Sequence, residues 1–240
     1  MKRGILDFIL DGIYEALRLL ISFDEETYFA IKTTLYSSFF SIIIALIIGM
    51  PLGFCLGYFN FFSKRFLRIL SDTGLAMPTV AIGLILYALF SNRGPLGNFA
   101  LLFTLKAVII GQICLSLPIV ISLTASVIEN MEIKHLRLIK SYHLRGYKQI
   151  LTVLFENRYP LMVVIATTYG RIVAEVGVAM MVGGNIKWHT RTITTAISLE
   201  TNKGEFAMGI ALASVLITIA FLVNLAIYAL KKFDKWKFQI

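Results

Sequence analysis

Long apolar stretches fill most of this sequence, and short polar or charged segments separate them. A helix needs about 20 mostly apolar residues to cross a lipid bilayer. Five stretches meet that length, at about 28–58, 66–90, 100–128, 160–182 and 206–230. Glycine and proline occur inside them, which neighbouring helices tolerate in a membrane. The pattern predicts an all-α integral membrane protein with about five transmembrane helices.

Three glycines in the first stretch, Gly49, Gly53 and Gly57, are spaced four residues apart. That spacing places them on one face of a helix. Because glycine has no side chain, another membrane helix can approach such a face closely. We therefore interpret these glycines as a packing surface between two helices.

The N-terminal segment, residues 1–27, has a different pattern. Its charged residues Asp7, Asp11, Glu15 and Arg18 fall at helical spacing on one face, opposite an apolar face. In a membrane-spanning helix each charge would cost roughly 2.5–3.5 kcal/mol near the centre. We expect an amphipathic helix that lies in the membrane interface. The alternative is a short helix packed on the rest of the protein.

Composition agrees with a membrane protein. Of the 240 residues, 58% are hydrophobic and 15% are charged, and the formal net charge is +9. Soluble domains are about 45–50% apolar and about 25% charged. These values exclude a soluble enzyme domain. In a membrane protein, an excess of Lys and Arg indicates basic cytoplasmic loops rather than a nucleic-acid partner.

The basic residues are distributed asymmetrically among the connections. One side of the membrane would carry Lys64, Arg65, Arg68, Lys134, Arg137, Lys140, Arg145, Lys148, Arg158, Lys231, Lys232, Lys235 and Lys237. The other side would carry Arg93, Lys187, Arg191 and Lys203. Because cytoplasmic loops are the more basic, we expect the N-terminus outside and the C-terminus in the cytoplasm of a multi-pass cell-membrane protein. Residues 28–230 form the membrane domain, and 231–240 a basic cytoplasmic tail.

Chemistry-bearing motifs are scarce. The sequence contains no His-Glu-x-x-His metalloprotease motif and no Gly-x-x-x-x-Gly-Lys-Ser/Thr nucleotide-binding loop. Cys55 and Cys114 lie in apolar runs, and His135, His143 and His189 have no partner at metal-ligand spacing. We therefore expect no catalytic, metal or cofactor site, and no ATP hydrolysis by this chain. A secondary transporter, which would show internal repeats or several intramembrane ionisable groups, is a less favoured alternative, as is an intramembrane enzyme.

The connection at about 129–159 is unusually long and basic. Helical periodicity continues on both sides of Gly146, and glycine permits a sharp turn between two short helices. The segment Ser141–Tyr147 could thus form a knob that docks in a groove of a cytosolic protein. A solvated amphipathic connector is the equal alternative.

Arg171 lies near the middle of the fourth apolar stretch, with Glu175 four residues later. A charge at that depth costs several kcal/mol unless it is paired or faces a wet cavity. The spacing would let the two side chains neutralise each other on one helix face. This pair is interpreted either as a structural ion pair or as a polar point on a path for a dianion.

Two regions carry a resemblance to a known family. The long connection resembles the cytoplasmic coupling loop of binding-protein-dependent ABC transporter permeases: it keeps Gly146 and Pro160 but reads Lys140-Ser141-Tyr142 where that family has Glu-Ala-Ala. A second region, reading GRIVAEVGVAMMVGGNI at 170–186 and TRTITTAI at 190–197, resembles the permease subunit of tungstate-type ABC importers, relatives of the molybdate permeases. MPTV at 77–80 and RGPLG at 93–97 share this likeness.

The resemblance implies a type I ABC importer permease that works as a homodimer with two cytosolic ATPase subunits and an extracytoplasmic oxyanion-binding protein. The substrate would be tungstate, with molybdate or another oxyanion as the alternative. It implies ATPase coupling by Ser141, Tyr142, His143, Leu144, Arg145, Gly146 and Tyr147, and a translocation path that includes Pro78, Thr79, Arg171, Glu175, Thr194 and Thr195. The turn at 183–185 and the threonines of 190–195, with Lys187 and Arg191 nearby, suit either an oxyanion or helix capping and contact with the binding protein. Of these we favour contact.

Overall fold

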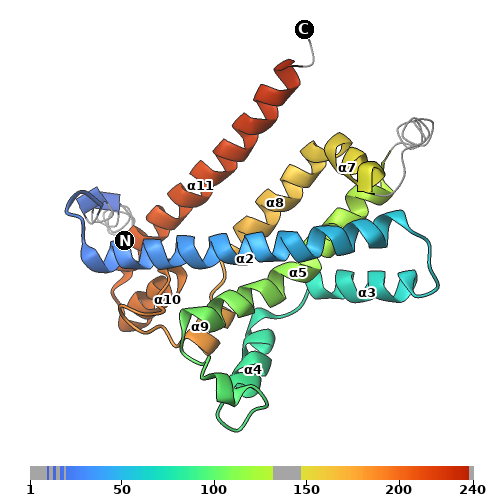
Figure 1. The fold of residues 1–240 in the computed structure, drawn as a ribbon. Helices are drawn as coiled ribbons and strands as arrows, with labels where there is room; N and C mark the ends of the chain where they lie inside the picture. Colours follow the sequence, from blue (N-terminus) through green and yellow to red (C-terminus); the bar gives the residue numbers. More distant parts are fainter. Residues whose placement is uncertain (1–9, 11–12, 15–16, 19, 132–146, 238–240) are drawn as a thin grey trace, which may run out of the picture.

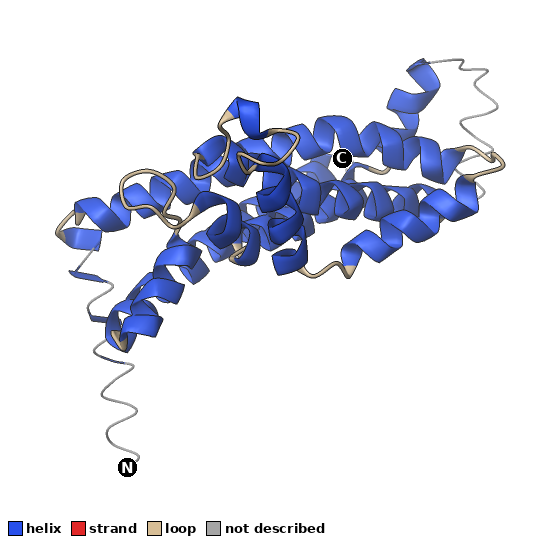
Figure 2. Ribbon diagram, turned by 90° about the horizontal axis from the view of Figure 1, so that it is seen from below, coloured by secondary structure: helices blue, strands red, loops and turns tan. Residues whose placement is uncertain are grey.

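The computed structural model describes residues 10, 13–14, 17–18, 20–131 and 147–237. Within these residues the regular structure is entirely helical (Figures 1 and 2). The elements are α2 (Glu25–Tyr58), α3 (Lys64–Leu75), α4 (Thr79–Phe90), the short 3₁₀ helix η1 (Gly97–Phe99), α5 (Leu105–Glu129), α7 (Tyr147–Glu156), α8 (Arg158–Val173), α9 (Gly177–Gly183), α10 (Ile193–Lys203) and α11 (Phe206–Lys237).

The long helices α2 and α5 lie side by side at the centre of the fold (Figure 1). Glycines of α2 allow this close approach. A Cβ atom on Gly53 would lie 2.6 Å from the carbonyl oxygen of Ile121, and one on Gly57 would lie 2.7 Å from that of Ala125. The prediction that the α2 glycines form a packing surface is confirmed.

Small hydroxyl side chains join α2 to α5 closer to the start of both helices. Ser37, Ser41, Gln112 and Ser116 are buried. The Ser41 hydroxyl oxygen lies 2.8 Å from Gln112 Oε1 of α5 and 2.7 Å from the Ser37 carbonyl oxygen of its own helix, so its proton can be donated to Gln112 across the interface. In a membrane such bonds hold helices together where the hydrophobic effect does not.

Two pairs of consecutive helices are bent relative to each other. The axes of α3 and α4 meet at 102°, and those of α7 and α8 at 75°. By length and composition α2, α5 and the first part of α11, Phe206–Leu225, can cross a membrane as straight helices, and each bent pair can count as one further span. The expected span 66–90 thus consists of α3 and α4, and the expected span 160–182 of α8 and α9, because α8 ends at Val173 and α9 begins at Gly177. Pro78 explains the first break, because its ring disfavours helical conformation in the preceding residue.

Helix α3 has no buried residue, yet its polar side chains are clamped to α5. Arg68 Nη1 donates to the Ser122 carbonyl at 2.9 Å, and Arg68 also pairs with Asp72 of its own helix at 3.3 Å. Lys64 Nζ lies 3.2 Å from Glu129 Oε1 at the end of α5. Pairing of this kind is what makes charges tolerable beside a membrane core. We call Lys64, Arg68 and Asp72, with their partners Ser122 and Glu129, the α3 clamp.

The α3 clamp gives a first prediction. Replacing Arg68 with leucine leaves Asp72 without its ion pair and the Ser122 carbonyl without its extra donor. We expect the melting temperature of the detergent-solubilised protein to fall by about 3–10 °C, measured by intrinsic fluorescence. Arg65 on the same helix is exposed, so Arg65→Leu is the matched control. An equal loss in both variants would contradict a role for the clamp.

The N-terminal helix stays a prediction. Asp7, Asp11 and Glu15, which define its charged face, lie outside the described residues. Those residues of this segment that are described before Ser22 are helical. Leu20 packs against a small core formed by α2, α10 and α11. Asp24 then caps α2 by accepting a hydrogen bond from the Thr27 N–H at 2.8 Å.

Candidate functional site

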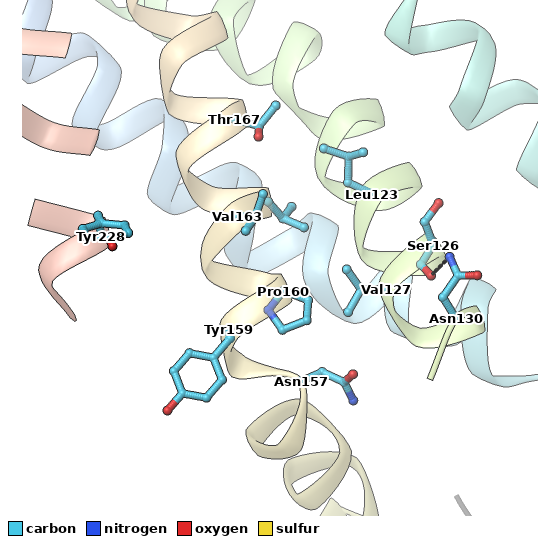
Figure 3. Close-up of a pocket in the computed structure, with 11 residues that line it drawn as sticks. Leu123, Ser126, Val127, Asn130, Asn157, Tyr159, Pro160, Val163, Thr167 and Tyr228 are labelled. Carbon is cyan, nitrogen blue, oxygen red and sulfur yellow. Dashed lines mark hydrogen bonds between the residues drawn. The ribbon is translucent and has the colours of Figure 1, made fainter. Parts of the chain in front are cut away.

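A cleft of about 850 Å³ opens between α5, α8 and α11 (Figure 3). It is lined by Leu123, Ser126, Val127, Asn130, Asn157, Tyr159, Pro160, Val163, Val164, Thr167 and Tyr228. The cleft lies at the end of the fold where α5 finishes and α8 begins.

The cleft walls are mostly apolar, and the polar side chains on them are largely satisfied by the backbone. Asn130 Nδ2 donates to the Ser126 carbonyl at 2.9 Å, the contact drawn in Figure 3. Asn157 Nδ2 donates to the Val153 carbonyl at 2.8 Å. None of the lining residues is charged. Such a surface offers weak contacts to a passing solute, and weak contacts allow its release.

Arg171 extends this exposed face of α8 beyond the cleft. Pro160, Val163, Thr167 and Arg171 are all exposed and follow one another at intervals of three or four residues. They therefore form one stripe along the helix. The first three line the cleft, and Arg171 stands in the last helical turn. The stripe thus leads from an uncharged cleft to a cation.

The predicted ion pair between Arg171 and Glu175 is not formed. Helix α8 ends at Val173, so the two residues do not share a helix face. Glu175 is buried, and its Oε1 accepts a hydrogen bond from the Val178 N–H at 2.9 Å, which caps the start of α9. Among the described residues no carboxylate pairs with Arg171, whose side chain is exposed.

Several other predicted path residues meet at the start of α9. The Thr194 hydroxyl donates to the Glu175 carbonyl at 2.8 Å. A Cβ atom on Gly177 would lie 2.7 Å from Thr79 Oγ1, so the start of α4 touches the start of α9. Pro78 precedes α4 and is exposed. The structure thus brings Thr79, Glu175 and Thr194 together and leaves Arg171 on the separate stripe of α8.

The threonines of 190–195 form contacts between helices and do not face an open space. Thr192 and Thr195 form a reciprocal capping box at the start of α10, with both side chains buried. The Thr34 hydroxyl of α2 accepts a hydrogen bond from the Ile193 N–H at 2.9 Å. Thr194 and Thr195 are therefore not on the surface of the cleft in this conformation.

The predicted coupling residues Ser141–Gly146 lie outside the described residues. Tyr147 is described: it begins α7 and is exposed. Helix α7 is anchored to the central pair, because Val153 packs with Phe54 of α2 and Ile128 of α5. Gln149 Nε2 also donates to the Tyr58 hydroxyl at 2.6 Å.

Two sets of residues at these sites were not predicted from the sequence. Thr167 and the cleft asparagines were not singled out, although the spacing of positions 160, 163, 167 and 171 could have indicated a shared face. Glu26 was also missed. It binds Arg191, which lies 165 positions away in the chain, and no local pattern reveals such a contact.

Comparison with known proteins places these features in a family. Residues 49–233 match the family described as binding-protein-dependent transport system inner membrane component. The chain is 62% identical over 232 residues to the tungstate uptake system permease protein TupB of Campylobacter jejuni, covering 97% of each chain. It is 36% identical to TupB of Peptoclostridium acidaminophilum, covering 95% of this chain and all of that protein.

The fold is also similar to a solved transporter structure. A chain in an inward-facing crystal form of the MetNI methionine ABC transporter superposes with a TM-score of 0.67, covering 84% of this chain and 92% of that chain at 14% identity. This likeness concerns the fold. Taken with the family match over most of its length, it makes the chain a multi-pass membrane protein that belongs to the binding-protein-dependent transport system inner membrane components.

Proposed function

We propose that this chain is the permease subunit of an ATP-driven importer that moves tungstate across the cell membrane. The observation that carries the proposal is the 62% identity, over nearly the whole of both chains, with a protein named as a tungstate uptake permease. The cleft is open, and Arg171 places a positive charge at the end of the exposed stripe on α8. Both features suit a path for a dianion. Import of molybdate or another oxyanion is the alternative.

The proposed assembly contains two copies of this permease, two cytosolic ATPase subunits and an extracytoplasmic oxyanion-binding protein. Its C-terminus would lie in the cytoplasm and its N-terminus outside. The basic residues near the α3 clamp and on the connection to α7 support this orientation. ATP hydrolysis would belong to the separate ATPase subunits, and the permease would form the gated passage.

In the proposed cycle, ATP binding closes the ATPase pair, and the segment Ser141–Tyr147 moves with it. Because α7 is packed on α2 and α5, this movement would tilt the membrane helices and turn the passage from inward-facing to outward-facing. The binding protein then delivers the anion, which passes Arg171 and leaves through the cleft. High-affinity selection would reside in the binding protein, because a permease must release what it passes.

The proposal is tested by uptake into proteoliposomes that contain the complete complex. ATP-dependent accumulation of tungstate is expected when the loaded binding protein is supplied, with sulfate as the comparison and molybdate as the closest competitor. Omission of ATP or of the binding protein should each abolish uptake. Accumulation of neither tungstate nor molybdate under these conditions would reject the proposed function.

A second prediction concerns the coupling segment. Gly146→Pro removes a backbone donor and fixes φ, and we expect it to separate ATP hydrolysis from transport. ATPase activity should no longer rise with the loaded binding protein, and uptake should be lost. The measurement is both rates on the same proteoliposomes, with the amount of assembled complex as the control. Transport-linked ATPase activity in this variant would contradict a docking role.

A further inference from the structure

Glu26, in the first turn of α2, holds two cations from the segment before α10. Lys187 Nζ lies 2.5 Å from Glu26 Oε2, and Arg191 Nη1 binds Glu26 Oε1. The guanidinium is fixed from its other side, because Arg191 Nε donates to Asn185 Oδ1 at 3.2 Å. Only 12% of the Arg191 side chain is exposed. Arg191 is therefore a preorganised cation and not a mobile surface group.

A cavity of about 410 Å³ lies beside this cluster, between α2, α10 and α11. Its charged lining residues are Asp24, Glu26, Lys187, Arg191, Glu200 and Lys203. Two of the acids have other partners: Asp24 caps α2, and Glu200 pairs with Lys203 at 2.8 Å. Glu26 is thus the carboxylate that pairs with both Lys187 and Arg191.

Lys187 and Arg191 share a single carboxylate. Glu26 offers them one negative charge, whereas an oxyanion with two negative charges could pair with both cations. Arg191 Nη1 and Lys187 Nζ each bind one oxygen of the Glu26 carboxylate, and a tetrahedral oxyanion can accept hydrogen bonds from the same two donors. The Glu26 carboxylate occupies the place of such an anion.

We propose that Lys187 and Arg191 form a binding site for a tetrahedral oxyanion, and that Glu26 is its internal occupant. An arriving anion competes with Glu26, which belongs to a different helix from the two cations and can be displaced with the start of α2. The proposal rests on the proposed function for the identity of the anion and for placing this face outside the cell. In this proposal the anion would bind to Lys187 and Arg191 before it reaches Arg171. The Glu26 carboxylate would prevent free anions from occupying this site.

The test uses the purified full-length permease and sodium tungstate. In Glu26→Gln the two cations lose their internal anion, and we expect tungstate to bind about tenfold more tightly than in the native protein. Bound tungsten is measured by equilibrium dialysis. Glu25→Gln is the matched control, because Glu25 is the neighbouring residue and is exposed. It removes the same charge and should leave binding unchanged.

The fluorescence of Trp188 can report whether the anion binds at Lys187 and Arg191. Its ring lies 5.3 Å from Lys187 Nζ and contacts Phe29 of α2. The chain has two tryptophans, so a Trp236→Phe background makes fluorescence report on Trp188 alone. Glu26→Gln should then show a saturable fluorescence change with tungstate that Lys187→Met and Arg191→Met both remove. A change that survives both substitutions would overturn the assigned site.

The results separate this inference from the proposed function. If native complexes import tungstate while Glu26→Gln binds it no better than Glu25→Gln, Glu26 is a structural ion-pair partner and the inference fails alone. If Glu26→Gln gains tungstate binding but the native complex imports neither tungstate nor molybdate, the anion site stands and the proposed function fails.

Discussion

Replacing Arg171 with leucine is expected to reduce oxyanion uptake by about a hundredfold or more, because an unpaired charge in a membrane span is worth several kcal/mol to an anion that passes it. The physical reason is that Arg171 has no carboxylate partner among the described residues, while Glu175 is engaged at the start of α9. A structural cation would be neutralised within the fold. Arg171, which is exposed, would be available to a passing anion under the proposed function.

The measurement is the initial rate of ATP-dependent tungstate uptake at equal amounts of assembled complex. Arg171→Lys retains the charge and should retain a substantial part of the rate, whereas Arg65→Leu removes an exposed arginine of α3 and should leave it unchanged. Native uptake in Arg171→Leu would remove Arg171 from the path. A loss of assembled protein in that variant would instead indicate a structural role.

Replacing Gly53 with leucine is expected to prevent stable folding. Its Cβ atom would lie 2.6 Å from the Ile121 carbonyl oxygen and 2.7 Å from Thr124 Cβ, and the backbone of α5 has no room to yield. Overpacking costs about 1–3 kcal/mol where neighbours can adjust, and more where they cannot. Because α2 and α5 form the centre of the fold, the effect should be loss of monodisperse protein on size-exclusion chromatography in detergent.

Gly170 provides the matched control for this substitution. It is also a helical glycine, but a Cβ atom on it would meet no atom within 4 Å. Gly170→Leu should therefore elute like the native protein and melt within a few degrees of it. Equal damage from both substitutions would show that glycine flexibility, and not the contact between α2 and α5, is what the fold requires.

Much of the architecture follows from local pattern. The apolar stretches locate the spans, because bilayer thickness fixes the length of each helix. The glycine spacing in α2 predicted a face for close helix packing, because one helix face is defined by residues close in sequence, but it did not identify α5 as the partner. The position of the bend between α3 and α4 can be predicted from Pro78. Its angle cannot, since the angle depends on what the two helices pack against.

The candidate site was harder to predict, for two reasons that Arg171 and Glu26 illustrate. Pairing Arg171 with Glu175 assumed one continuous helix, and the helix ends between them at Val173. An interval of four residues indicates a contact only if the helix persists. Glu26 meets Lys187 and Arg191 through tertiary packing, which no sequence interval encodes.

The α3 clamp also has a mechanical consequence. A helix of 12 residues is about 18 Å long. Its first turn is tied to Glu129, beside the connection that leads to α7, and its far end passes through Pro78 to Thr79, which touches Gly177. Because Arg68 and Asp72 also bind Ser122 of α5, helix α3 would move together with α5 and carry Thr79 and its contact with Gly177 along.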